Sequence, residues 1–114
     1  MSEEDMSESV IAAVDLVVTN AAAEVRPVQL RLYAPTPDGG GAWTCRVDLE
    51  GLYSRLAPAV GEDALQALCL ALALAARALR EIVAGGGRVE YAAGGEFPHE
   101  AYFGWLGPLR APAT

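Results

Sequence analysis

The residues that most directly suggest chemistry in this sequence are Cys45 and the single histidine, His99. A thiolate beside an imidazole base is the arrangement of a cysteine nucleophile. Cys45, however, falls on the apolar side of an alternating segment, where a cysteine behaves as a small hydrophobic residue. We therefore expect no catalytic residues, and we expect His99 to lie in a surface loop.

Metal and phosphate chemistry also lack the residues they need. One histidine and two separated cysteines, Cys45 and Cys69, do not make a metal-ligand set or a disulfide framework. The glycine triplets are not followed by the lysine of a phosphate-binding loop. We expect no cofactor and no metal.

The acid Asp63 has a structural explanation. Gln66 follows it by three residues, directly before an apolar run, which is the spacing of a capping box at a helix start. We interpret Asp63 and Gln66 as a helix cap rather than as acid–base groups.

Composition indicates one globular domain, because 53% of the 114 residues are hydrophobic and 20% are charged. Four acids fall within the first eight residues, so most of the net charge of −7 belongs to the N-terminus. We expect an acidic disordered tail over residues 1–9, a single domain over 10–109 and a C-terminal tail over 110–114.

Charge and hydropathy exclude several classes of protein. The bases are scattered arginines without any lysine, which argues against nucleic-acid binding. We expect no signal peptide, because the N-terminal residues lack a basic region followed by an apolar run, and the apolar run at 64–76 is too short to span a membrane. We expect a cytoplasmic protein that binds neither nucleic acid nor membrane.

Alternation of apolar and polar residues predicts strands at 10–19, 27–33 and 43–50, with a short fourth at 88–91. The proline- and glycine-rich residues 34–41 cannot continue a strand, so they are expected to link two strands of a hairpin. Its outer face would carry paired, solvated charges from Arg31, Arg46, Asp48 and Asp15.

Residues 61–87 predict one long helix, which ends at a glycine triplet. An apolar stripe on one side is expected to pack on the sheet, and it comprises Leu65, Leu68, Leu72, Ala75, Leu79 and Ile82. Leu70 and Leu74 point nearly opposite, so a second surface must cover them. The fold class is therefore α+β: an antiparallel meander of three to four strands with one long helix on one face.

The C-terminal segment is rich in aromatic residues, with four of the chain's eight lying between residues 97 and 105. These are Phe97, Tyr102, Phe103 and Trp105. With Leu70 and Leu74, they form a candidate packing or partner surface, covered either within the chain or by another subunit.

Several of these residues form a pattern that resembles a group of small bacterial domains of unknown function. The matching elements are Trp43-x-Cys45, Leu49-x-Gly51-Leu52 and Gly61-x-Asp63-x-x-Gln66-Ala67-Leu68. The likeness covers about residues 31–79, and Ala64 departs from it because the family tends to have serine there. The resemblance implies an antiparallel sheet with one packed helix and no established activity.

The function that we expect is a non-enzymatic protein-interaction or self-association module, with a homodimer or another protein as partner. The alternative is a small-molecule binder with a pocket between the sheet and the C-terminal aromatics. An enzyme is the least favoured interpretation, and it would need His99 to gather with Glu96 or Glu100 in a concave site.

Overall fold

The computed structural model describes residues 9–53 and 56–106. The predicted tails therefore lie outside the described residues except for Ser9, whose carbonyl accepts a hydrogen bond from the Ala34 amide. The elements in chain order are β1 (Val10–Thr19), β2 (Val25–Tyr33), β3 (Thr36–Pro37), β4 (Trp43–Cys45), β5 (Val47–Glu50), β6 (Ala59–Gly61), α2 (Ala64–Ala84), β7 (Arg88–Tyr91), α3 (His99–Phe103) and the 3-10 turn η1 (Gly104–Leu106).

The strands form two antiparallel sheets, which confirms the predicted α+β class. One sheet has the order β5-β2-β1-β7 and the other has the order β3-β4-β6. The predicted strand at 43–50 is interrupted at Arg46, so β4 belongs to the smaller sheet and β5 to the larger. The Tyr33 amide donates to the Arg46 carbonyl across this break, which keeps the two sheets adjacent.

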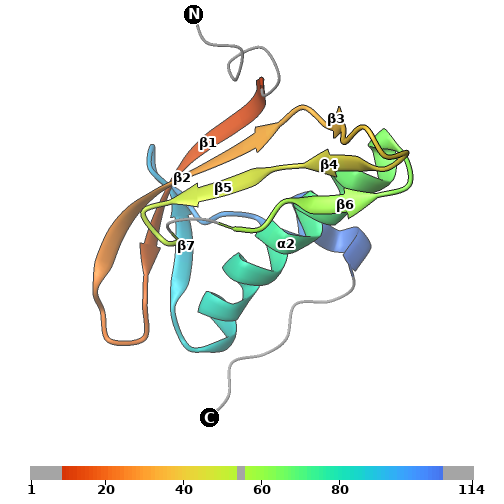
Figure 1. The fold of residues 1–114 in the computed structure, drawn as a ribbon. Helices are drawn as coiled ribbons and strands as arrows, with labels where there is room; N and C mark the ends of the chain where they lie inside the picture. Colours follow the sequence, from red (N-terminus) through yellow and green to blue (C-terminus); the bar gives the residue numbers. More distant parts are fainter. Residues whose placement is uncertain (1–8, 54–55, 107–114) are drawn as a thin grey trace, which may run out of the picture.

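Two short strands arise where the sequence indicated connecting loops. β3 lies in the proline-rich linker and pairs Thr36 with Thr44, and β6 pairs Val60 with the same residue from the other side of β4. β6 is therefore a strand that was not among those predicted from the sequence. β6 leads directly into α2, which lies across one face of the sheets and leads to β7 at the far edge (Figure 1).

The side of α2 that faces the sheet consists mainly of alanine rather than of the predicted leucine stripe. Leu65 is 68% exposed, so its assignment to the buried face was wrong. Leu68, Leu72 and Ile82 are partly buried at the margin of the core. The fully or nearly fully buried helix residues are Ala67, Ala71, Ala75, Ala76, Ala78 and Leu79.

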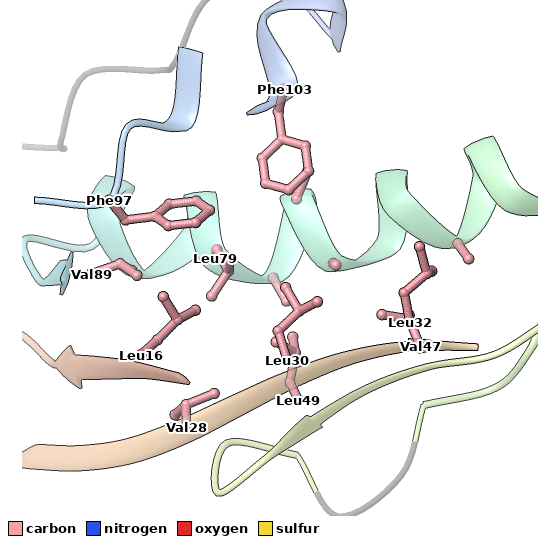
Figure 2. Close-up of a cluster of buried hydrophobic side chains, with 14 of the residues drawn as sticks. Leu16, Val28, Leu30, Leu32, Val47, Leu49, Leu79, Val89, Phe97 and Phe103 are labelled. Atoms are coloured by element: carbon pink, nitrogen blue, oxygen red, sulfur yellow. The ribbon is translucent and has the colours of Figure 1, made fainter. Parts of the chain in front are cut away.

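The buried side of α2 can consist of small residues because the strands contribute the large side chains of the core. Figure 2 shows Leu16, Leu30 and Leu49 pointing from the strands towards α2, and all three are buried. Alanine lets the helix backbone come close enough for these side chains to fill the space at native density. Phe97 and Phe103 reach the helix from the C-terminal segment and complete the core.

The ends of α2 agree with the predicted cap and stop. The Asp63 side chain accepts a hydrogen bond from the Gln66 amide at 2.7 Å, and Gln66 Oε1 accepts from the Glu62 amide at 2.6 Å. At the other end, Gly86 has φ +100°, a conformation that favours glycine.

In the described part of the chain, no helix is both long and apolar enough to cross a membrane.

Candidate functional site

An apolar hollow lies beside α2, on a flank of the helix that the sheet does not cover. Its volume is about 360 Å³, and its lining is Leu56, Ala57, Pro58, Ala59, Val60, Leu70, Ala73, Leu74 and Arg77. Leu70 is 43% exposed and Val60 is 58% exposed. We call this feature the α2–β6 groove. Large exposed apolar side chains that lie together in a hollow distinguish it from singly scattered surface leucines.

A second hollow adjoins the groove and shares Val60 with it. This hollow has a volume of about 610 Å³ and is lined by Gly40, Gly41, Ala42, Val60, Gly61, Glu62 and Gln66. Together the two hollows follow the same flank of α2 and its approach from β6. Arg77 lies at one end of this surface and Glu62 lies at the other.

The junction between β6 and α2 fixes the position of the groove. A Cβ atom built on Gly61 would lie 2.5 Å from the Ala67 amide nitrogen, so only glycine permits this close approach. The Asp63–Gln66 cap then sets the start of the helix. Because each residue turns the helix by about 100°, burial of Ala71 and Ala75 against the sheet directs Leu70 to the groove.

The C-terminal aromatics do not line either hollow. The Tyr102 ring stacks on Phe97 with centroids 4.8 Å apart, and the Trp105 indole nitrogen donates to the Tyr102 carbonyl at 3.1 Å. The Phe103 carbonyl accepts from the Arg80 guanidinium at 3.0 Å, which holds the segment on another side of α2. Leu70 and Leu74 are therefore separate from the aromatic residues with which the sequence grouped them.

The four aromatics divide into core and surface. Phe97 is 2% exposed and Phe103 is 4% exposed, so both are packing residues within the chain. Tyr102 and Trp105 are about half exposed. The Tyr102 hydroxyl lies 2.8 Å from that of Tyr91, and this hydrogen bond raises the pKa of Tyr91. The exposed pair is anchored to the core through the stack on Phe97.

His99 is buried, so its predicted place in a surface loop was wrong. It begins the short helix α3, is 7% exposed and packs edge-on against Phe97 with centroids 5.0 Å apart. Its Nδ1 atom is buried and has no hydrogen-bond partner among the residues that the structure describes. Burial and the nearby Arg80 charge lower the pKa of His99, and Glu96 and Glu100 offset this only in part. A neutral imidazole here acts as a packing residue.

Cys45 lies in the core, as its position in the alternation predicts. It is 1% exposed, its thiol donates to the Tyr33 carbonyl at 3.3 Å, and burial raises its pKa. A thiol with a raised pKa is a poor nucleophile at neutral pH. The contacts of Cys45 and His99 are with different parts of the core, so the two do not form a nucleophile–base pair.

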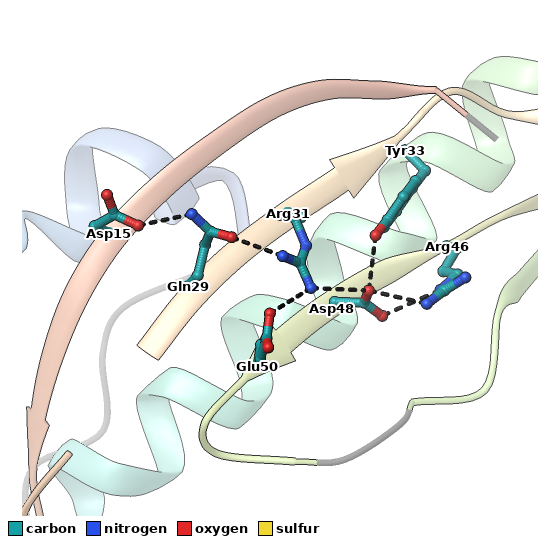
Figure 3. Close-up of polar contacts among 7 residues, drawn as sticks. All are labelled: Asp15, Gln29, Arg31, Tyr33, Arg46, Asp48 and Glu50. Atoms are coloured by element: carbon teal, nitrogen blue, oxygen red, sulfur yellow. Dashed lines mark hydrogen bonds and ion pairs between the residues drawn. The ribbon is translucent and has the colours of Figure 1, made fainter. Parts of the chain in front are cut away.

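The outer face of the larger sheet carries a polar network centred on Asp48 (Figure 3). Arg46 binds both oxygens of this carboxylate at 3.1 and 3.0 Å, the Tyr33 hydroxyl donates at 2.9 Å and Arg31 lies at 3.7 Å. Burial acts to raise the pKa of Asp48, but the hydrogen bonds from Arg46 and Tyr33 outweigh it and lower the pKa. A carboxylate with this many donors has little capacity left for a ligand.

The network extends across β2 to β1. Arg31 pairs with Glu50 at 2.6 Å and donates to Gln29 at 2.7 Å, and Gln29 in turn donates to Asp15 at 2.8 Å. Gln29 and Arg31 alternate along β2 with the buried Leu30 and Leu32, which places these two polar side chains on the face away from α2. The outer face is therefore a solvated surface whose charges bind one another, as the sequence predicts.

The residues of the motif pattern have structural roles in this fold. A Cβ atom on Gly51, which has φ +100°, would collide with the Pro27 carbonyl oxygen. Trp43 of β4 pairs with Gly61 of β6, and Ala67 is fully buried on the side of α2 that faces the sheet. The pattern therefore marks the fold rather than a reaction centre. Within 9–53 and 56–106, no group of three or more His, Cys, Asp and Glu side chains could hold a metal ion.

The residues of the candidate surface that sequence reasoning missed include Val60, Glu62 and Arg77. Val60 lies outside all of the predicted strands, and Arg77 was not assigned to either apolar side of the predicted helix. The last turn of α2 contains no basic residue, and Arg77 lies two turns before the helix end. The available signal was the seven-residue spacing of Leu70 and Arg77, which puts both on one flank of a helix.

Comparison with curated proteins and with solved structures found no match. A family model described as "Domain of unknown function (DUF6968)" matches residues 15–97. This range includes β6, the whole of α2 and both hollows, and it ends before α3. The chain therefore belongs to the DUF6968 family of domains of unknown function.

Proposed function

We propose that this chain is a non-enzymatic protein-interaction module whose contact surface is the α2–β6 groove. The observation that supports this function is the half-exposed, apolar flank of α2 at Leu70, which lies next to the half-exposed Val60 of β6. Covering these two side chains would contribute roughly 1 kcal/mol each, since full burial of such a residue contributes about 1.5–3 kcal/mol.

The edge strand β6 adds a second reason to expect a protein rather than a small ligand. In the sheet order, β6 is a terminal strand and pairs with β4 on one side. An edge strand beside an apolar pocket can receive both main-chain hydrogen bonds and side chains from a polypeptide. Leu56, Ala57 and Pro58 continue the apolar wall before this strand.

The alternative, a ligand pocket between the sheet and the C-terminal aromatics, has less support. Phe97 and Phe103 are almost fully buried, and they fill the space where that pocket was expected. The enzyme interpretation also has less support, since His99 packs against Phe97 and its Nδ1 atom has no hydrogen-bond partner within 9–53 and 56–106.

Site-specific photo-crosslinking tests the proposed function. A benzophenone amino acid replaces Leu70 in one variant and Leu65 in the matched control, because Leu65 is more exposed but does not line the groove. After irradiation in cells, we expect position 70 to give a discrete protein adduct that mass spectrometry identifies, and position 65 to give none. Equal labelling at both positions, or none at position 70, would contradict the proposal.

A further inference from the structure

We infer that the α2–β6 groove binds a second copy of this chain, with the two α2 helices antiparallel about a two-fold axis at Leu70. This inference rests on the proposed function, because it names the partner of the same surface. Three features support it: the charges of the groove and the adjoining hollow, their lack of ionic partners among the described residues, and the apolar centre of the groove.

The charges at the two ends of the surface are of opposite sign. Arg77 follows Leu70 by seven residues, which is about 10 Å along the helix. Glu62 precedes Leu70 by eight residues, just before the cap. A two-fold axis at Leu70 would therefore place each Arg77 beside Glu62 of the other copy. A two-fold axis forms this contact twice, since an isologous interface repeats each contact.

Neither of these charges forms an ion pair with another residue that the structure describes. Among the described residues, the Arg77 guanidinium and the Glu62 carboxylate form no ion pair, whereas Arg31, Arg46 and Arg88 all pair with acids. The two charges border an apolar surface, where exclusion of water strengthens an ion pair. Such pairs set the orientation and the specificity of an interface more than its affinity.

The centre of the groove suits contact with its own copy. Ala73 is small and lies between Leu70 and Arg77 on the same flank, so it allows two helices to approach closely. Leu70 would then meet its counterpart at the axis, where both lose their contact with water. The edge strand β6 lines the same groove as α2. The two-fold axis at Leu70 would therefore bring β6 of both copies into the interface that the two α2 helices form.

Charge reversal provides the test, with the molar mass from sedimentation equilibrium as the measurement. The single variants R77E and E62R place like charges at both ends of the interface, so each should weaken self-association at least about tenfold. The matched control is R26E, which changes the net charge in the same direction and by the same amount as R77E, at an exposed residue of β2 outside the groove. This control should associate as the wild type does.

Two further samples separate the inference from a simple loss of folding. An equimolar mixture of R77E and E62R should form a heterodimer with a mass of twice 11.9 kDa, because acids then meet bases at both ends. The double variant R77E/E62R should again form a homodimer. Far-UV circular dichroism of each single variant checks that α2 is intact.

Failure to restore association in both the mixture and the double variant would overturn the inference. A wild type that remains at 11.9 kDa at every concentration would overturn it as well. The proposed function has a separate outcome, because a crosslink from position 70 to a different protein would support an interaction surface while excluding the second copy. Absence of any crosslink there would remove both.

Discussion

The outer face of the larger sheet and the α2–β6 groove are both exposed, but they differ in how their polar groups are satisfied. On the outer face, Asp48 and Arg31 each bind several neighbours within the chain. In the groove, Leu70 and Val60 leave apolar surface exposed. Two charges flank it, Arg77 of the groove and Glu62 of the adjoining hollow, and neither has an ionic partner among the described residues.

This difference identifies the surface that a second molecule can use. A partner on the outer face would have to replace hydrogen bonds that already exist within the chain. A partner in the groove would cover Leu70 and Val60 and give Arg77 a first ionic contact. The number of polar groups on a surface is therefore a poorer guide to binding than the number that still lack a partner.

Of the two surfaces, the outer face should show the larger effect on stability, and Asp48→Ala is the variant that tests it. The substitution removes the acceptor of Arg46, Arg31 and the Tyr33 hydroxyl at once, so the free energy of unfolding should fall by about 1–3 kcal/mol. Urea denaturation measures the change. Glu50→Ala is the control, because its exposed pair with Arg31 should contribute less than about 1 kcal/mol. Equal losses would show that Asp48 is not the centre of the network.

A smaller, pH-dependent effect is expected from His99 in the C-terminal cluster, which belongs to neither surface. Its pKa is lowered in the folded chain, so the unfolded chain binds a proton first as the pH falls below about 6.5. Stability should therefore decrease from pH 7 towards pH 5, until the folded chain also binds the proton. Thermal denaturation should show a weaker dependence on pH in His99→Asn over this range, and an unchanged dependence would contradict the assignment.

The smallest effect on stability is expected in the groove itself. Leu70→Ala removes a side chain that is 43% exposed, so under conditions that keep the chain monomeric the free energy of unfolding should change by less than about 0.5 kcal/mol. Urea denaturation at low protein concentration makes the comparison with Leu79→Ala, which is fully buried and should cost about 2–5 kcal/mol. A comparable loss in both variants would place Leu70 in the core rather than at the surface.

Much of the fold could be predicted because its signals are local. Alternation located β2 and β5, and the Asp63–Gln66 spacing located the start of α2. Local signals also placed Leu70 off the sheet-facing side of the helix. They identified Ala75 and Leu79 on the buried face of α2 but not Ala67 and Ala71, because the stripe was defined mainly by leucines and the close approach to the sheet requires small residues.

The rest depended on contacts between distant segments. β6 has three residues, too few to show alternation, and only its pairing with β4 makes Val60 part of an edge. Arg77 and Glu62 become ends of one surface only when β6 and α2 are placed together. His99 was assigned to the surface because the five residues of α3 do not reveal in sequence that Phe97 and Arg80 enclose it.

Sedimentation equilibrium of Leu70→Asp, with Leu65→Asp as its control, tests self-association through the groove most directly. Leu70 is 43% exposed and Leu65 is 68% exposed, and each substitution puts a carboxylate in place of a leucine on α2. With rising concentration, the wild type and Leu65→Asp should approach twice 11.9 kDa, while Leu70→Asp should remain at 11.9 kDa. A wild type that stays monomeric, or two variants that behave alike, would contradict the account.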